Sequence, residues 1–383
     1  MRSGDGTRPQ DLHTSTIASG LPVLSAHVVG TEEARLAPGP GHPSATGRCD
    51  GTVDSAHGGR EEDTVDHGQH SGMWVPSEPP AWERMFLVHL EAWSVVAYLS
   101  ILGTLLYLVG VFRLRRTGVR WPWWRTTSWI VGTASVFLVT GTWLNGYSMA
   151  LFSIHMVQHM VLAMIAPLFL LVGAPMTLAL RALPRGRNAA GTPRALLLNA
   201  LHSRPARVVS SPMFTVPLFI ASLYGIYFTP MFDWLMSSPA GHQLMLAHFV
   251  VTGLLFFGPI VAQDPWPRQH SHPARILELA VPIPFHAFFG VAVMIASTLL
   301  VDTFANPPAD WGVDPIGDQT VAGGIAWSFG ELPTVLVLIV VLVSWASSDE
   351  RRARAVDRAA ERTGDAELVA YNARLKALSE QER

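Results

Sequence analysis

The apolar stretch from Leu151 to Gly173 contains two histidines, His155 and His159, spaced four residues apart. On an α-helix this spacing places both imidazole rings on the same face, one above the other. A second stripe beside them consists of three methionines: Met156, Met160 and Met164. Imidazole and thioether groups are ligands that suit copper, and Cu(I) in particular accepts methionine. Methionine alone more often fills a core, whereas paired histidines inside a membrane helix favour a functional site.

The composition predicts an integral membrane protein. Of the 383 residues, 49% are hydrophobic and only 15% are charged, which is too apolar for a soluble enzyme of this length. The net charge of −2 indicates no particular class of partner, and we expect no nucleic acid. The single cysteine, Cys49, excludes a disulfide within the chain and a Cys-x-x-Cys metal or redox motif. A metal site must therefore use other ligands.

Both ends of the chain differ from its middle. Residues 1–84 are rich in Gly, Ser, Pro, Asp and Glu, and they carry too little apolar surface to offset the entropy lost on ordering. We therefore predict a disordered extracytoplasmic tail, with Met73 or Met85 as an alternative start of the protein. Residues 349–383 combine charge with a helical spacing of apolar side chains. They predict a charged cytoplasmic helical tail.

The middle of the chain, residues 85–348, contains seven apolar runs of about 20 residues, the length needed to cross a bilayer. These runs cover approximately residues 87–112, 128–148, 151–173, 211–229, 242–262, 277–301 and 321–346. The sequence therefore predicts an all-α, polytopic membrane protein with a bundle of seven transmembrane helices.

The arginines predict how this bundle is oriented. The connections after the first, third, fifth and seventh runs all carry arginine, whereas the alternate connections contain neither lysine nor arginine: 149–150, 230–241 and 302–320. Short loops rich in Lys and Arg stay in the cytoplasm. We therefore predict that the N-terminus lies outside and the C-terminus in the cytoplasm.

This orientation places the histidines of three runs in the outer half of the membrane. They are His89 in the first run, His155 and His159 in the third, and His242 and His248, with Met245 between them, in the fifth. His242 and His248 differ by six positions, which separates them by about 120° around a helix. The sequence therefore favours His155, His159 and His248 as copper ligands, with His242, His89 and Met245 as second choices. No carboxylate is expected at this depth, which argues against a zinc hydrolase.

Two further polar residues, His286 and Glu331, are predicted near the middle of the sixth and seventh runs. Intramembrane ionisable groups are functional candidates, so the two can pair and carry protons or tune the copper site. A hydrogen-bonded pair that only orients the two helices is an equal alternative. His270 and His272 are predicted on a solvated cytoplasmic loop.

The segments SIHMVQHMVLAMIAPLFLLVGAP, HQLMLAHFVVTGLLFFGPI and DPWPR resemble the CtaG-like family of caa-type cytochrome c oxidase assembly proteins. The resemblance covers roughly residues 86–346, and four histidines fall on its motif positions: His155, His159, His242 and His248. It implies a seven-helix protein of the bacterial cell membrane that helps a terminal oxidase to mature, plausibly by handling copper. The implied partners are oxidase subunits and an extracytoplasmic copper carrier.

Three functions remain open from the sequence. The first is a non-catalytic assembly factor that binds copper at the outer leaflet and passes it to the oxidase. The second is a haem-binding membrane redox protein, in which paired histidines ligate the iron; the lack of outer Lys or Arg for the haem propionates counts against it. The third is a copper or proton transporter, with His286 and Glu331 as a step at the membrane midplane.

Overall fold

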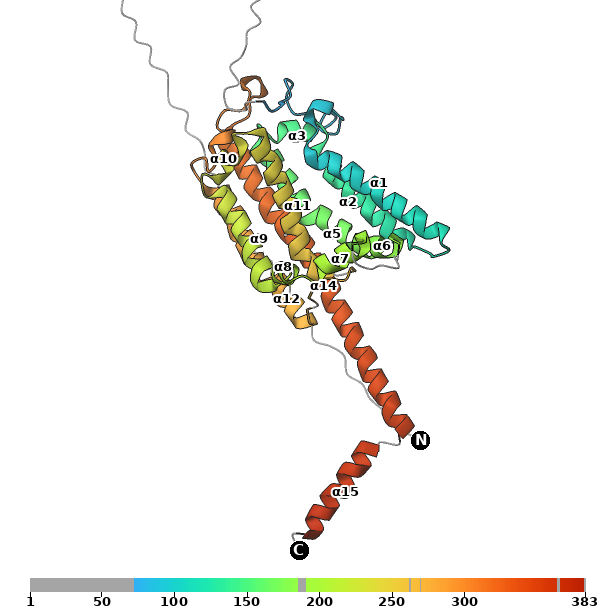
Figure 1. The fold of residues 1–383 in the computed structure, drawn as a ribbon. Helices are drawn as coiled ribbons and strands as arrows, with labels where there is room; N and C mark the ends of the chain where they lie inside the picture. Colours follow the sequence, from blue (N-terminus) through green and yellow to red (C-terminus); the bar gives the residue numbers. More distant parts are fainter. Residues whose placement is uncertain (1–71, 185–190, 262, 269, 364–365, 382–383) are drawn as a thin grey trace, which may run out of the picture. The chain divides into compact units, whose positions relative to one another are not determined.

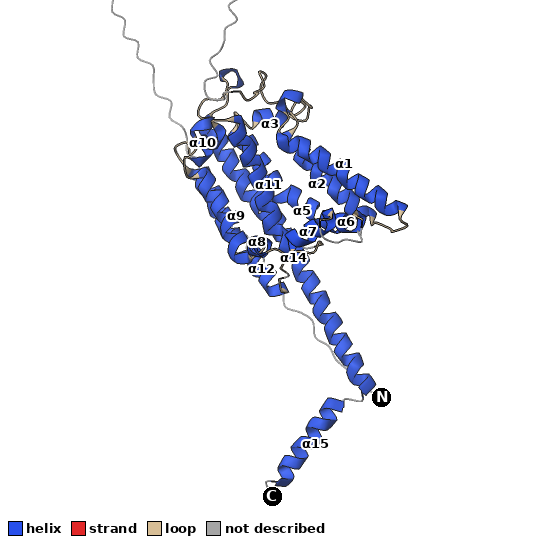
Figure 2. Cartoon of the chain, in the orientation of Figure 1, coloured by secondary structure: helices blue, strands red, loops and turns tan. Residues whose placement is uncertain are grey.

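The computed structural model describes residues 72–184, 191–261, 263–268, 270–363 and 366–381. The regular structure of these residues is helical, and their only β pairing is an isolated bridge between Val88 and Thr142. Figure 2 accordingly shows helices joined by loops. The prediction of an all-α chain is confirmed. The predicted tail falls mainly on residues 1–71, which lie outside the described residues.

Five helical segments of the described chain are long and apolar enough to cross a membrane: Val95–Arg116, Phe152–Ala182, Pro239–Val261, His272–Ile295 and Pro315–Arg362. The helices that form them are α1 (Val95–Arg116), α4 (Phe152–Met160), α5 (Ala166–Val172), α6 (Pro175–Ala182), α11 (Pro239–Val261), α12 (His272–Ala280), α13 (Pro282–Ile295) and α14 (Pro315–Thr363). The other helices are α2 (Trp123–Thr140), α3 (Trp143–Tyr147), α7 (Pro193–Leu201), α8 (Arg204–Val209), α9 (Pro212–Tyr227), α10 (Met231–Met236) and α15 (Ala366–Gln381).

Two of the seven predicted spans differ from this group of five. The second corresponds to α2, which carries several hydroxyl side chains and is less apolar than the others. The fourth corresponds to α9, whose 16 residues reach about 24 Å, against a hydrocarbon core of about 30 Å. Both are helices, so the prediction of helical structure is right, but neither has the length and hydropathy of the remaining five.

Helix ends shift where a side chain caps the backbone. The first span was predicted at 87–112, but α1 begins at Val95 because the Ser94 hydroxyl accepts a hydrogen bond from the Ala97 amide at 3.1 Å. Residues before Ser94 form the bridge at Val88 and a short 3-10 turn, Leu90–Ala92. His89 therefore lies outside α1, not within a helical span.

The predicted third span is a continuous helical run with a change of geometry in its middle. A π-helical turn, Val161–Ile165, separates α4 from α5. Pro167 follows it in the first turn of α5 and has no amide hydrogen to donate to an α-helical bond. A widened turn just before a proline accommodates its ring. The run ends at Ala174, whose positive φ of 50° lets the chain turn into α6.

Close helix packing assembles the core around α4, α11, α13 and α14. Figure 1 shows α9 beside α11 and α1 beside α2, in agreement with their contacts. Helices α13 and α14 are in close contact where glycines face the neighbouring backbone. A Cβ added at Gly290 would lie 2.7 Å from the Trp327 amide nitrogen, and one added at Gly323 would lie 2.5 Å from that of Met294. Small residues of this kind let membrane helices pack closely.

Some described residues of the predicted tails are also ordered. Trp74 stacks on His89 with ring centroids 4.4 Å apart, and its indole fills the space beside Gly146. Packing thus starts before the predicted boundary at residue 85. At the other end, residues 347–381 are helical where described and mostly exposed, in the last part of α14 and in α15.

Candidate functional site

Helix α4, which carries His155 and His159, is held at both its start and its middle by other helices. Its N-cap residue, Leu151, has no side chain that can accept a hydrogen bond. Asp318 of α14 takes this role, because its carboxylate accepts a hydrogen bond from the Ser153 amide at 3.1 Å and another from the Ser153 hydroxyl. This carboxylate was missed in the sequence, where none was expected at this depth.

Gln158 fixes the same helix against α2 and α3. It lies between His155 and His159 in the sequence and is fully buried. Its amide nitrogen donates to the Val139 carbonyl and to Asn145 Oδ1, both at 2.7 Å. Asn145 in turn donates to the Ala92 carbonyl at 2.8 Å. A glutamine at the centre of an apolar run was the available sequence signal for this network. The network fixes the rotation of α4 and hence the direction of its histidines.

His155 is completely buried in an aromatic enclosure. The rings of Phe232 and Phe304 have centroids 4.9 Å and 5.8 Å from that of the imidazole. The ring interacts with the Ser148 carbonyl, but neither of its nitrogens reaches hydrogen-bond geometry with another described residue. His242 of α11 is also buried, lies within electrostatic range of His155 and has an unpartnered Nε2. The two imidazoles thus offer free nitrogens in one region.

His159 lies at the centre of the histidine group. Its Nδ1 is 3.2 Å from the Tyr227 hydroxyl, and its ring meets that of Phe249 edge to face at 4.1 Å. It is within electrostatic range of three other imidazoles: His155, His248 and His286. A cavity of about 10 Å³ lies between His159 and His286. This is close to the smallest space that holds one water molecule, roughly 10–15 Å³.

His248 faces away from the aromatic enclosure. Its Nε2 is 2.9 Å from the Ser222 hydroxyl on α9 and 3.4 Å from that of Thr252. It is half-buried and, together with Met245, lines an open pocket of about 430 Å³ between α9, α10 and α11. Its Nε2 is therefore already satisfied by protein, in contrast to Nε2 of His155 and of His242.

Around His286 the helices are in close contact. The imidazole packs directly against Gly330 of α14, where any side chain would overlap it, and its Nε2 has no partner. Glu331 is half-buried, and no hydrogen bond or ion pair joins it to His286 within the described residues. The predicted pairing of His286 with Glu331 is therefore not seen, and His286 instead contacts α14 at Gly330. His89 stacks on Trp74 and is 3.6 Å from Glu91, apart from the other histidines.

The histidines of α4, α11 and α13 lie in one region of the bundle, but they do not form a complete set of metal ligands. In the described parts of the chain, no three His, Cys, Asp or Glu side chains come close enough to hold one metal ion. His159 is within electrostatic range of His155, His248 and His286, and His155 is within electrostatic range of His242. We call these five imidazoles the histidine row. The methionines predicted beside them are all buried in the surrounding core: Met156, Met160, Met164 and Met245.

His270 does not lie in solvent as predicted. Its side chain is only 7% exposed, and its Nδ1 is 2.9 Å from the Glu278 carboxylate, which is 1% exposed. Thr215 of α9 approaches the other oxygen of Glu278 at 3.1 Å. The sequence shows only a polar loop here, because the contacts of Glu278 with His270 and with Thr215, 63 residues away in sequence, cannot be seen in local pattern.

The DPWPR segment also has a structural role. Asp264 is buried and accepts hydrogen bonds from the Met176 amide at 3.1 Å and the Thr177 amide at 2.7 Å, so it caps α6. Trp266 packs so closely on Gly258 that no side chain fits there. Both contacts hold the end of α11 against neighbouring segments.

Comparison with known proteins identifies a family whose model matches most of this chain. The model of a family described as cytochrome c oxidase caa3 assembly factor matches residues 105–348. An uncharacterized protein of Mycobacterium tuberculosis is 40% identical over 314 residues, and one of Mycobacterium leprae is 38% identical over 309 residues. Each alignment covers 80% of this chain and 47% of the relative, so the chain spans about half the length of the curated relatives it matches. No solved structure matches the chain significantly.

Proposed function

We propose a function from the premise that this chain belongs to the cytochrome c oxidase caa3 assembly factor family. The protein is a multi-pass protein of the bacterial cell membrane that acts with oxidase subunits during their assembly. It is not an enzyme. Its buried histidines receive Cu(I) at the outer end of the bundle, from an extracytoplasmic copper carrier, and release it to the oxidase. Copper is cargo in this proposal, so the site must both bind and release it.

The observation that carries the proposal is the set of buried imidazole nitrogens without partners. At the histidine row they are Nδ1 and Nε2 of His155, Nε2 of His242 and Nε2 of His286; Nε2 of His270 and Nδ1 of His272 are also unpartnered, but they lie around α12. Buried polar atoms in proteins are nearly always hydrogen-bonded, and each one left unsatisfied costs about 1–3 kcal/mol. A ligand bound to these nitrogens would give them a partner and so remove this free-energy cost. Neutral imidazole in apolar surroundings, with thioether sulphur nearby, suits Cu(I).

His155 and His242 form the best receiving pair, because both retain a free nitrogen and lie near each other. A pair of imidazoles supplies two ligands and leaves the shell open, in agreement with the absence of a three-residue group among the described residues. A site that passes an ion onward must bind it strongly enough for entry and weakly enough for exit. An incomplete shell meets this requirement better than a closed one.

Two alternatives are less well supported. A haem held by paired histidines needs both rings on one pocket of several hundred Å³, whereas the pocket of about 430 Å³ is lined by a single histidine, His248. A transporter that uses His286 and Glu331 as a midplane step would be supported by a bond between them, and no such bond lies in the described chain. Both observations count against the alternatives.

The test is anaerobic loading of the purified protein with Cu(I) in the presence of a competing chelator, followed by metal analysis. We expect His155→Ala and His242→Ala to weaken Cu(I) binding by at least about 10–100-fold, the loss that removing even an outer-shell partner causes. His89→Ala is the matched control and should bind as the unaltered protein does, because His89 stands outside the row. Equal copper in all three variants, with unchanged melting temperatures, would refute the proposal.

A further inference from the structure

A long groove runs between α5, α11, α12 and α14, separate from the histidine row. Its volume is about 520 Å³, and its walls are mainly aliphatic. Leu336 and Val340 on α14 are 55% and 66% exposed, while Leu168 and Ile260 form the facing wall. In a membrane-spanning bundle such an apolar groove faces the acyl chains of lipids.

The polar residues of this groove lie together at one end. Gln263 follows the end of α11, and His272 and Arg275 lie in the first turn of α12. On α14 the lining extends from Leu332 to Ser344, about 18 Å along the helix axis. One leaflet of hydrocarbon is about 15 Å deep, half of the bilayer core. The groove therefore has the length of an acyl chain and a polar entrance at one end.

Two donors at this entrance have no partner. Nε of Arg275 and Nδ1 of His272 are buried and bonded to no described residue. Glu278 lies within electrostatic range of Arg275, but its two oxygens are engaged by His270 and Thr215. A guanidinium so placed favours an anionic oxygen ligand, and phosphate is the anion it matches best.

We propose that this groove binds an anionic phospholipid, with one acyl chain along α14 and the phosphate at Arg275 and His272. The site is independent of copper and requires only that the bundle lies in a membrane. A basic pocket between helices at the membrane surface is a recurrent means of holding lipid headgroups. The unpartnered donors distinguish such a lipid from an isoprenoid quinone, which has no phosphate.

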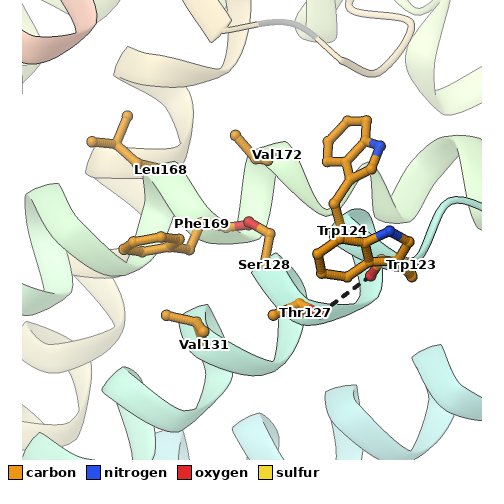
Figure 3. Close-up of a pocket in the computed structure, with 8 residues that line it drawn as sticks. All are labelled: Trp123, Trp124, Thr127, Ser128, Val131, Leu168, Phe169 and Val172. Atoms are coloured by element: carbon orange, nitrogen blue, oxygen red, sulfur yellow. Dashed lines mark hydrogen bonds between the residues drawn. The ribbon is translucent and has the colours of Figure 1, made fainter.

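A neighbouring pocket provides an internal comparison (Figure 3). It lies between α2 and α5, has about 380 Å³ and shares three of the groove's apolar residues, Leu168, Phe169 and Val172. No charged side chain lines it. The hydroxyls of Thr127 and Ser128 are occupied, by the Trp123 carbonyl at 3.3 Å and the Phe169 carbonyl at 2.7 Å. This pocket should therefore accept an apolar chain without preference for its headgroup.

The experiment is native mass spectrometry of the full chain in detergent with phosphatidylglycerol or with diacylglycerol, which has no phosphate, of identical acyl chains. The unaltered protein should retain phosphatidylglycerol in preference. Arg275→Gln should weaken phosphatidylglycerol binding by roughly tenfold, the effect of one hydrogen bond to a charged group, and leave diacylglycerol binding unchanged. Leu336→Trp fills the groove from an exposed position and should lower the occupancy of both lipids. Val131→Trp, in the pocket of Figure 3, is the control and should keep the preference.

Equal binding of both lipids by the unaltered protein would overturn the proposal, as would a preference that survives Arg275→Gln. An isoprenoid quinone that occupies the groove independently of Arg275 would overturn it too. Melting temperatures establish that each variant is folded. If Arg275→Gln does not fold, Leu336→Trp decides by itself, because unchanged phosphatidylglycerol occupancy in this variant contradicts the assigned groove.

Discussion

At the residue scale, Asp318 and Asp264 each cap a helix that is distant along the chain. Asp318 binds the start of α4 through Ser153, and Asp264 binds the start of α6 through Thr177. The first amides of a helix lack acceptors inside it, and the helix dipole favours a carboxylate there. The start of the histidine helix is thus fixed by the same side chain that joins it to α14.

The buried pair of His270 and Glu278 leads to a prediction about stability. We expect His270→Ala to destabilise the protein by about 3–5 kcal/mol, because removing one partner leaves the other buried without its counterpart. The change would appear as a lower melting temperature of the detergent-solubilised protein. Glu278→Gln is the companion variant, since its amide can still bond to both Thr215 and His270.

An exposed pair on α14 is the control for this prediction. Arg354 and Glu350 are more than 60% exposed and four residues apart on the helix. Solvent screens such pairs, so Arg354→Ala should change stability by no more than about 0.5 kcal/mol. Equal melting temperatures for His270→Ala and Arg354→Ala would show that the buried contact does not stabilise the fold.

At the element scale, close packing between α13 and α14 places His286. The two helices meet through Gly290 and Gly323, and the imidazole of His286 packs on Gly330 in the same interface. A larger residue at any of these glycines would push the helices apart. The position of His286 beside the cavity of His159 therefore depends on the absence of side chains on its neighbours.

Two adjacent glycines allow this dependence to be tested. A Cβ at Gly323 would lie 2.5 Å from the Met294 amide nitrogen, whereas one at Gly324 would meet only the end of the Met294 side chain, at 3.9 Å. We expect Gly323→Ala to cost about 1–3 kcal/mol through overpacking, and Gly324→Ala to be tolerated or slightly stabilising, because alanine favours helix. Thermal unfolding of the two variants side by side would measure the difference, and equal melting temperatures would contradict the packing described.

At the scale of the whole molecule, arginines from separate connections gather at one end of the bundle. Arg125 donates to Gln263 at 3.3 Å and stacks on Trp121, and Arg181 lies over the same indole at 6.0 Å. Arg268 donates to Ser211 at 3.2 Å. The arginine-rich connections share one end, as a single cytoplasmic face requires, and which side of the membrane this end faces stays a prediction.

Single cysteines in a Cys49→Ser chain would test this orientation. We expect Glu91→Cys and Ser237→Cys to react with a membrane-impermeant maleimide in intact cells, and Arg120→Cys and Arg204→Cys to react only after permeabilisation. All four positions are exposed in the structure. Labelling of positions 204 and 237 from the same side would show that the short helix α9 does not cross the membrane. Labelling of position 120 from outside would reverse the predicted orientation.

The sequence by itself determined the properties that depend on local composition and period. The length of the apolar runs predicted helices, and the segregation of arginine predicted that successive connections lie on alternate sides of the membrane. The four-residue spacing placed His155 and His159 together on α4. Each of these signals is carried by residues close together along the chain.

Only the tertiary structure decided which of these groups lack partners and which are satisfied. The hydroxyls of Tyr227 and Ser222 hydrogen-bond to one ring nitrogen of His159 and of His248, respectively. His155 and His242 keep ring nitrogens without a hydrogen-bond partner. These assignments depend on contacts between helices that are far apart in sequence, and such contacts leave no periodic pattern. Depth in the membrane could place the histidines in one region, but the rotation and close packing of the helices decided what each ring faces.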